Sequence, residues 1–392
     1  MNLNATMVAG LEAAGLVLLW GCRTKSEPQL GDALRGLSPE QQAEFVQGKQ
    51  TFQRVFDPTN GLGPLFNANS CAQCHEDPVV AGVGDEVEVH ATRFSPPHAC
   101  DPLFQEGGPV FELHATPLLE AHGFTNDPVP ADATAVGHRS SPPLFGLGLV
   151  DAIPEATILS REDPNGTKRH GIRGHANRTI DGRVGRFGRK ADTAALFDFI
   201  VGAYHEEMGI TSPLEPAKKT IDGQPVPPDT ILGPDPNITT NEIGETVAFV
   251  RFLAPPPKQV FTNEQERVLA DLGRRLFVNL DCAVCHVPEM KTGPSDIEAL
   301  NCKTAALYSD LLLHDLGPAL ADICLGDAHP SDFRTEMLWG LRFQQQFLHD
   351  GSAKSVEEAI QRHGGEAQHA ADRFKALSDD EKKALLKFLD SI

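Results

Sequence analysis

Two copies of a Cys-X-X-Cys-His motif constrain this chain more than any other feature of its sequence. One copy runs from Cys71 to His75, the other from Cys282 to His286. In such a motif two thiols can add across the vinyl groups of a haem, and the adjacent histidine becomes the proximal iron ligand. Zinc is the alternative, but structural zinc sites place their second cysteine pair roughly 15–20 residues on. We therefore predict two covalent haem c groups, attached at Cys71, Cys74, Cys282 and Cys285, with His75 and His286 as iron ligands.

The segment before each motif has the pattern of a capped amphipathic helix. Before the first motif, Ser38 is a candidate N-cap with Gln41 at N3, and the apolar face holds Phe45, Phe52 and Phe56. Before the second, Thr262 is the candidate cap with Gln265 at N3, and the apolar stripe holds Val268, Leu269, Leu272 and Leu276. A helix leading into the haem motif is how a cytochrome c domain begins. We predict a mainly α protein of two cytochrome c-like domains, with long loops and a few short strands.

Proline-rich segments divide the chain. Residues 254–258 open with Ala-Pro-Pro-Pro, which cannot continue a helix. This segment is predicted to link an N-terminal domain (38–253), which has a helical pattern at 241–253, to a C-terminal domain (259–392). A helix capped by Ser378, with Glu381 at N3, ends the second domain. Residues 82–188 are rich in Pro and Gly, and we expect a long insertion of loops and short strands there.

Residues 1–22 have the pattern of an export signal. The apolar run at 13–22 is too short for a membrane span and fits the hydrophobic region of a signal peptide. Residues 19–22 resemble a lipobox, in which Cys22 would be lipidated and would anchor the chain to a membrane. The bulky Trp20 and the acidic Glu12 depart from that pattern. Because bacterial c-type haem is attached outside the cytoplasm, we predict a periplasmic protein, with attachment through Cys22 as a hypothesis.

The formal net charge of −20 limits the partners of this chain. Nucleic acid is unsuited, because its phosphates need a basic face. A small redox protein that donates electrons remains compatible, since net charge says little about one local patch.

Four cysteines lie outside the two motifs. Cys302 and Cys324 flank one short segment and are the candidate disulfide, which leaves Cys100 and the N-terminal Cys22. No Cys-X-X-Cys pair outside the motifs is present in the sequence for dithiol chemistry.

Several short segments carry a resemblance to a known family. Four in the C-terminal half resemble bacterial di-haem cytochrome c peroxidases: residues 333–335, 338–341, 347–352 and 356–360. A wider set resembles the related di-haem oxidoreductases, a peroxidase-like family also labelled thiol oxidoreductases: residues 61–67, 146–154, 185–188, 208–212, 310–315 and 363–367. The resemblance extends from about residue 38 to residue 392, and the combined motifs are highly specific.

The resemblance implies a second haem with two histidine ligands. In the peroxidases the distal ligand follows the Glu-Glu-Ala segment closely, usually as Met, and the matching position here is His363. It lies near the end of a helix that we expect Ser355 to cap, with Glu358 at N3. His286 and His363 together would give a lower potential than a His/Met pair, because methionine raises the potential. Met337 and Met290 are the alternative ligands.

The resemblance also implies catalytic residues at the first haem. The peroxidases use the carboxylate of a Glu-Met-Gly motif as an acid/base in peroxide cleavage, and Glu207 begins the matching motif here. They also have a labile distal histidine before a proline-containing loop, for which His138 is the candidate. The alternatives for that role are His170, His175 and His205.

Three further features follow from the same resemblance. Trp339 is a candidate to conduct electrons between the haems, with core packing as its alternative role. A calcium ion between the domains, bound in part by the backbone oxygen of Thr335, is a hypothesis. Arg189 and Glu336 depart from the family pattern, which commonly has an aromatic residue and a proline-containing pair at these places.

The two motifs and the resemblance together imply an enzyme. The second haem would accept electrons from a small redox protein and pass them to the first haem, which would reduce peroxide. The alternative is a non-catalytic di-haem electron-transfer protein with both haems six-coordinate. A further hypothesis is an oxidase that acts on a partner protein. With 15 histidines and 5 methionines in the chain, composition does not decide which haem has an open face.

Overall fold

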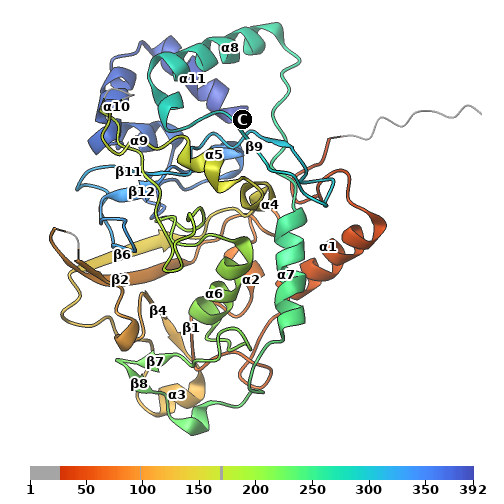
Figure 1. Cartoon of the computed structure of the whole chain (residues 1–392), viewed down its shortest axis with the longest axis vertical. Helices are drawn as coiled ribbons and strands as arrows, with labels where there is room; N and C mark the ends of the chain where they lie inside the picture. The colour runs from red at the N-terminus through yellow and green to blue at the C-terminus, as the bar shows by residue number, and fades with distance from the viewer. Residues whose placement is uncertain (1–26, 98, 168–170) are drawn as a thin grey trace, which may run out of the picture.

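The computed structural model describes residues 27–97, 99–167 and 171–392. The predicted signal peptide with Cys22, and also His170, lie outside these residues. Within them the chain forms eleven α-helices and twelve strands, most of the strands only two or three residues long (Figure 1). Helix is therefore the main regular structure, as predicted. None of the described helices is both long and apolar enough to cross a membrane.

The elements have the following bounds in chain order. The α-helices are α1 (Pro39–Phe52), α2 (Cys71–Cys74), α3 (Pro117–Ala121), α4 (Leu147–Asp151), α5 (Glu155–Leu159), α6 (Leu196–Met208), α7 (Thr240–Phe252), α8 (Glu264–Asn279), α9 (Val356–Gln361), α10 (Gln368–Lys375) and α11 (Asp379–Asp390). The strands are β1 (Leu65–Phe66), β2 (Val87–Ser95), β3 (Ala99–Asp101), β4 (Val110–Phe111), β5 (His114–Ala115), β6 (Ala135–Ser140), β7 (Thr220–Ile221), β8 (Gln224–Pro225), β9 (Met290–Lys291), β10 (Thr304–Ala305), β11 (Leu313–Asp315) and β12 (Asp332–Arg334). The 3₁₀ turns are η1 (Phe104–Glu106), η2 (Pro228–Thr230), η3 (Cys282–Val284), η4 (Leu341–Phe343) and η5 (Gly365–Ala367).

Local capping explains where the predicted helices begin. Ser38, Thr239 and Ser378 each form a capping box, in which the cap side chain and the N3 side chain bond each other's backbone, at α1, α7 and α11. Ser355 caps α9 as predicted. The cap of α8 was predicted one residue too early, because the side chain of Asn263, and not Thr262, accepts from the backbone of Gln265.

Two helix pairs cross through a glycine, one pair for each motif. In α1, a Cβ added to Gly48 would lie 2.0 Å from the carbonyl oxygen of Glu245 in α7. In α8, a Cβ added to Gly273 would lie 2.0 Å from the carbonyl oxygen of Ala384 in α11. No side chain larger than hydrogen fits between backbones this close. The helix that precedes each motif therefore lies directly on a helix from much later in the chain.

An aromatic pair accompanies each glycine crossing. Phe52, one turn after Gly48, packs on Phe249 with ring centroids 5.1 Å apart. Phe277 stands one turn after Gly273 and packs on Phe388 at 5.4 Å. The same arrangement of Gly and Phe thus occurs twice, once in the helix before each motif.

The buried face of α8 differs from the predicted stripe. Its buried residues are Ala270, Gly273 and Phe277, whereas Val268 is 55% exposed. The predicted leucines, Leu269, Leu272 and Leu276, are only half-buried. The stripe was misplaced because the close crossing with α11 selects small residues for the contact face, and a pattern of large apolar residues does not detect them.

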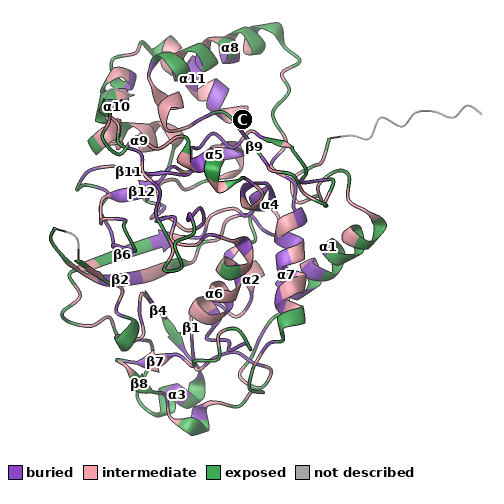
Figure 2. Cartoon of the chain, viewed as in Figure 1, coloured by how far each residue is buried: buried purple, intermediate pink, exposed green. Residues whose placement is uncertain are grey.

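The core continues past the predicted linker. The largest buried cluster joins side chains of α1, α6 and α7 to Met290, Leu312 and Trp339, which all follow residue 258. A second cluster beneath α8 and α11 is purely C-terminal. Figure 2 shows that α7 and α11 both contain buried residues. Ala254 and Pro256 of the linker are themselves buried, and the domain boundaries stay a prediction.

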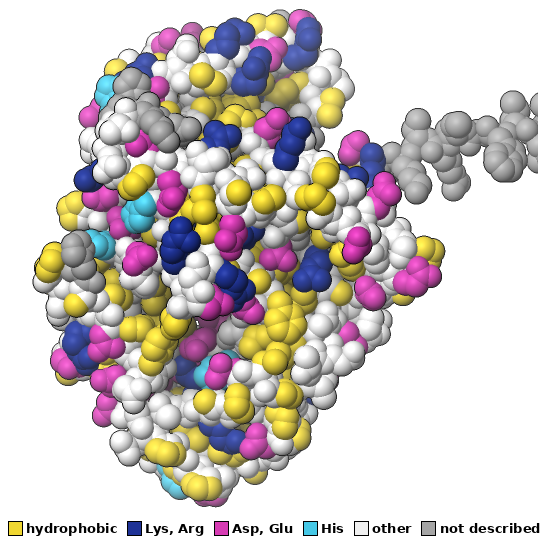
Figure 3. Space-filling view, in the orientation of Figure 1, with side chains coloured by type: hydrophobic (Ala, Val, Ile, Leu, Met, Phe, Trp, Pro, Cys, Tyr) yellow, Lys and Arg dark blue, Asp and Glu magenta, His cyan; other side chains and the backbone are white. Residues whose placement is uncertain are grey.

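The 82–188 region contains the largest sheet, as well as the expected loops. β2 pairs antiparallel with β3, β4 and β6. Glu88 and His90 lie two residues apart on β2 and therefore on the same face. On the face of the molecule that Figure 3 shows, acidic side chains are interspersed with Lys and Arg rather than separated into a basic stripe.

The disulfide joins Cys100 to Cys324, so the predicted Cys302–Cys324 pair is wrong. Cys100 lies on β3, and the hairpin of β2 and β3 carries it to within 5.9 Å, Cα to Cα, of Cys324. Cys302 is exposed and free. Nearness in the sequence misled the prediction, because the true partners are 224 residues apart and meet only through the hairpin.

Candidate haem centres

The first motif, Cys71 to His75, begins as the single-turn helix α2. Ser70 caps this helix by accepting from the backbone of Gln73. The Nδ1 atom of His75 lies 3.2 Å from the carbonyl oxygen of Gly82. A carbonyl oxygen only accepts, so Nδ1 carries the proton and Nε2 keeps its lone pair. This is the tautomer that an iron ligand needs.

The second motif, Cys282 to His286, repeats this arrangement. The Nδ1 atom of His286 lies 3.0 Å from the carbonyl oxygen of Tyr308, which again leaves Nε2 free. Burial, and then the charge of His363, lower the pKa of His286 to about 4, so the imidazole is neutral, as a ligand must be. The ring of Phe277 stands 6.5 Å from that of His286, much as Phe52 stands 6.2 Å from His75.

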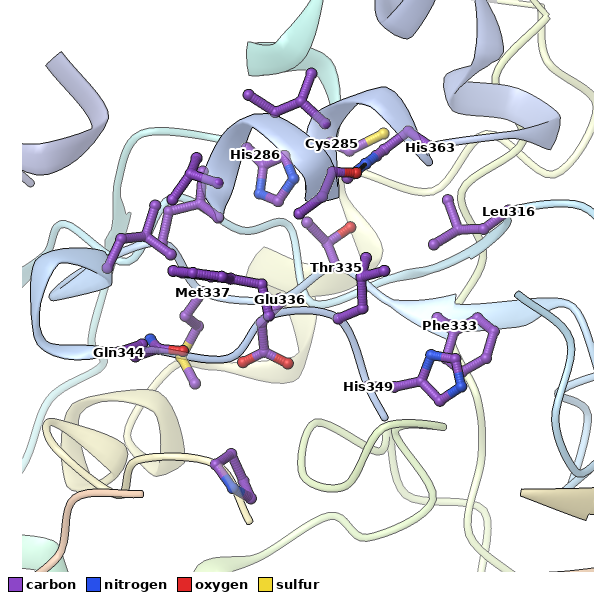
Figure 4. Close-up of a pocket in the computed structure, with 18 of the residues that line it drawn as sticks. Cys285, His286, Leu316, Phe333, Thr335, Glu336, Met337, Gln344, His349 and His363 are labelled. Carbon is purple, nitrogen blue, oxygen red and sulfur yellow. Dashed lines mark hydrogen bonds between the residues drawn. The ribbon is translucent and has the colours of Figure 1, made fainter. Parts of the chain in front are cut away.

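A cavity of about 960 Å³ adjoins the second motif. Its wall includes Cys282, Cys285, His286 and His363, and cavities of this size enclose cofactor-sized ligands. Figure 4 shows His286 and His363 close to Cys285, with Glu336 and Met337 further along the pocket. Two thiols and two imidazoles on the wall of one cavity are a donor set that fits a haem.

His363 is positioned as a ligand by its own backbone. It follows α9, two residues after the helix ends, and its Nδ1 lies 2.7 Å from the carbonyl oxygen of Ala359. Its Nε2 is therefore free, as in His75 and His286. Of the alternative ligands, Met337 also lines the cavity, whereas Met290 is buried in the core and is not part of the cavity wall.

The same cavity reaches toward the first motif. Its wall includes Glu76 and Asp77, which directly follow His75, and also Gly84. The loop at 140–143 contributes to this wall too, and the backbone of Pro142 interacts with His75. The two candidate haem sites are therefore neighbours, and the 140–143 loop belongs to both.

Glu207 ends up beside the first motif. It lies near the end of α6, and its carboxylate accepts a hydrogen bond of 2.9 Å from the side-chain amide of Asn67. Its carbonyl oxygen accepts from the backbone of Asn67 at 2.7 Å. Burial, and then the negative charge of Glu88, raise the pKa of Glu207 well above its usual range. The charge of Glu207 in turn helps to raise the pKa of Cys74, after the larger effect of burial. A carboxyl group with a raised pKa can exchange a proton near neutral pH.

His138 is not brought to either motif by the structure. It is exposed on β6, where Gly137 and Arg139 on either side of it are buried and point to the other face. Among the alternatives, His205 bonds the carbonyl oxygen of Ala217, and His175 lies on the C-terminal side of the molecule beside Asp332.

A largely buried pair of side chains that was not predicted from the sequence, His90 and Glu88, lies near the first motif. His90 and Glu88 on β2 are joined at 3.0 Å, and the charge of Glu88 acts on both His75 and Glu207. Burial alone would raise the pKa of Glu88, but the hydrogen bond from His90 lowers it. The period-two spacing of these residues in a strand was the available signal, but the region was expected to be mainly loop.

Arg189 and Glu336, the two residues that depart from the family pattern, contact each other. The guanidinium of Arg189 lies 2.6 Å from the carboxylate of Glu336, and Arg334 lies 3.1 Å from the same group. Burial alone would raise the pKa of Glu336, but the charges of Arg334 and Arg189 lower this pKa to about 2. The departures therefore form one ion-paired unit on the cavity wall.

The remaining predicted residues have structural contacts. Trp339 is 6% exposed and packs so close to Gly146 that a Cβ there would lie 2.8 Å from its ring.

The backbone oxygen of Thr335 accepts from the hydroxyl of Ser309 at 2.6 Å and from the guanidinium of Arg334 at 3.0 Å. These donors occupy the oxygen that the calcium hypothesis needs. The described residues also contain no cluster of three or more His, Cys, Asp or Glu suited to a metal ion.

Comparison with known proteins adds the family to the two neighbouring haem sites. A family model described as "Di-haem oxidoreductase, putative peroxidase" matches residues 125–392, about two thirds of the chain. The chain belongs to this di-haem oxidoreductase family, which implies two haem cofactors. The matched region contains Glu207, the second motif and His363, and it begins after the first motif. No curated protein matches the sequence.

Solved structures resemble the fold only distantly. Hydrazine synthase of Kuenenia stuttgartiensis aligns with a TM-score of 0.42 and 11% identity, over 99% of this chain and 100% of that one. The di-haem peroxidase BthA of Burkholderia thailandensis aligns with a TM-score of 0.41 and 14% identity, over 91% and 86%. A MauG-like protein associated with microbial copper homeostasis aligns at 0.28 and 16%, over 68% and 91%. These likenesses add nothing to the family match.

Proposed function

We propose that this protein is an exported di-haem c-type peroxidase with one relay haem and one reactive haem. The relay haem is attached at Cys282 and Cys285, and the reactive haem at Cys71 and Cys74. The observation that carries the proposal is an asymmetry between the two sites. The second motif has another imidazole, His363, on the wall of its cavity, whereas the first motif has a partly buried carboxyl group, Glu207, with a raised pKa.

At the relay site His286 and His363 would hold the cofactor as its two iron ligands. Each ring donates its Nδ1–H to a backbone carbonyl, which leaves Nε2 of each ring for the iron. Two histidine ligands leave no open position for a substrate, which suits electron transfer. Apolar side chains such as Phe277 and Leu389 line the same cavity and exclude water.

At the reactive site Glu207 moves the proton. Reduction of hydrogen peroxide consumes two electrons and two protons and yields two molecules of water. The haem, when bound, would supply the electrons and the position at which peroxide binds. The ionised carboxylate of Glu207 takes the proton from the near oxygen of peroxide and returns it to the departing oxygen. Asn67 holds this carboxylate in place through its side-chain amide.

The electron donor is a small redox protein in this proposal, and the protein acts in the periplasm, with Cys22 as the site of lipid attachment. The shared cavity wall supports transfer between the centres, because it runs from the second motif to the residues that follow the first. The pattern of residues 1–22 supports export.

Turnover of peroxide by the purified holoprotein tests this proposal. With a chemically reduced small cytochrome as donor, we expect peroxide-dependent oxidation of the donor. His363→Gly should lower this rate and change the spectrum of the second haem. Absence of turnover by a protein that holds both haems covalently would favour the non-catalytic carrier instead.

A further inference from the structure

His314 is a buried histidine with a carboxylate on each ring nitrogen. It lies on β11 and is 4% exposed. Its Nε2 is 3.0 Å from the carboxylate of Asp310, and its Nδ1 is 3.0 Å from the carboxylate of Glu366. An ionised carboxylate only accepts hydrogen bonds, so both nitrogens of His314 donate and the ring is an imidazolium. No other function assigned above uses this group.

The Asp310 end of this triad is joined to the proximal side of the second haem site. The backbone N–H of Asp310 donates to the carbonyl oxygen of Cys285 at 2.9 Å. Two residues earlier, the carbonyl oxygen of Tyr308 accepts from Nδ1 of His286. The segment from Tyr308 to Asp310 therefore fixes both the second cysteine and the proximal histidine.

The Glu366 end is joined to the distal side. Glu366 lies three residues after His363, in η5, and its carboxylate also accepts from the backbone of Arg173 at 2.9 Å. The loop between His363 and Glu366 lies directly on β11, because a Cβ added to Gly365 would be 2.2 Å from the carbonyl oxygen of Asp315. His314 thus connects the segment 363–366, which carries the distal ligand, to strand β11.

His314 itself reaches the cofactor side of the cavity. It lines the cavity together with Glu366, and its Nδ1 is 3.7 Å from the sulfur of Cys285. Gly174 makes room for the ring, since a Cβ there would lie 2.8 Å from Cε1 of His314. One side chain therefore touches the proximal segment, the distal segment and the attachment point of the haem.

We propose that His314, held between Asp310 and Glu366, is a positioning residue that keeps His363 on the iron of the second haem. This inference rests on the proposed bis-histidine relay haem. The triad acts as a charged bridge between the two axial-ligand segments. When the bridge is broken, the His363 segment can move away from β11, and the distal position opens for part of the time.

Exogenous imidazole is the probe, because it binds only where the distal position is open. If His314→Gln raises the open fraction of the second haem from about 1% to about 10%, its affinity for imidazole rises about tenfold. We also expect a growing high-spin signal from this haem and a shifted midpoint potential. Glu366→Gln, which keeps its size, should move all three in the same direction. Glu357→Gln, a charge-matched change on α9, should move none of them.

The outcomes separate the triad from the relay assignment. His363→Gly sets the upper limit of imidazole binding, and if it leaves the second haem unchanged, the bis-histidine proposal itself fails. If His363→Gly opens the haem while both His314→Gln and Glu366→Gln keep the wild-type spectrum, potential and imidazole affinity, the role of His314 is wrong. Should His314→Gln not fold as a holoprotein, Glu366→Gln decides by the same three measurements.

Discussion

His286 and His363 line one cavity. The Nδ1–H of His286 donates to the carbonyl oxygen of Tyr308 at 3.0 Å, and that of His363 donates to the carbonyl oxygen of Ala359 at 2.7 Å. Their free Nε2 atoms are therefore fixed by the backbone before any cofactor binds, and little side-chain freedom is lost on ligation. At the first motif, Nδ1 of His75 bonds the carbonyl oxygen of Gly82 in the same way, and the charge of Glu207 acts on Cys74. This difference underlies the proposed division into a relay and a reactive haem.

Replacement of Glu207 tests the acid/base role. Glu207→Gln should lower peroxide turnover by about 100-fold, the usual worth of such a group, without loss of haem. Because the pKa of Glu207 is raised well above its usual 4.5, wild-type kcat/KM should increase with pH through that raised pKa, as the carboxylate forms. This limb should vanish in Glu207→Gln and persist in Glu120→Gln, a change of an exposed glutamate. Unchanged turnover would contradict the assignment.

The glycine crossing of α8 and α11 makes a prediction about stability. Gly273→Ala places a Cβ where it would meet a backbone oxygen at 2.0 Å, and we expect overpacking to cost about 1–3 kcal/mol or more. Gly244→Ala is the matched control, because this helical glycine in α7 has open space around it. That control should be neutral or stabilising, by up to about 1 kcal/mol. Equal midpoints of urea unfolding for the two variants would mean that the helices do not cross so closely.

Removal of the disulfide should destabilise the protein. The bond closes a segment of 224 residues, and the loss of such a bond typically costs about 2–4 kcal/mol. Replacement of both Cys100 and Cys324 by Ser should therefore lower the thermal midpoint, whereas Cys302→Ser, at the exposed free cysteine, should not. If the Cys302 variant were the one to lose stability, the pairing would be wrong.

Buried Glu112 makes stability depend on pH. Burial raises its pKa to about 8, although Lys219 opposes the shift at 2.9 Å. A group whose folded pKa lies above its unfolded value of 4.5 favours the folded state only while it is protonated, so stability should fall as pH rises from about 4.5 to 8. Thermal unfolding of Glu112→Gln should show a smaller fall over this window. An equal fall in both proteins would show that Glu112 is ionised at no cost.

Local patterns in the sequence were sufficient to predict helices α1, α7, α8, α9 and α11. The capping boxes at Ser38 and Ser378 and the Cys-X-X-Cys-His spacing act within a few residues, so they can be predicted without the fold. The same Gly-X-X-X-Phe spacing is present in the sequence at Gly48–Phe52 and at Gly273–Phe277. A pattern of large apolar residues does not detect these glycines.

Long-range contacts were not predictable in this way. Cys100 meets Cys324 only because β2 and β3 form a hairpin, and Glu88 reaches the first motif only because β2 turns its inner face there. The pairing of Arg189 with Glu336 joins positions 147 residues apart, and each looked like an isolated departure in the sequence. Such partners depend on tertiary packing, which a single sequence does not encode locally.

The spectrum of the holoprotein during stepwise reduction tests the division of labour most directly. We predict one low-spin haem with two histidine ligands in every state, lost in His363→Gly, and a second haem that becomes high-spin by half-reduction and then reacts with peroxide. Two haems that stay low-spin in every redox state, with no reaction with peroxide, would contradict the assignment of a relay and a reactive centre.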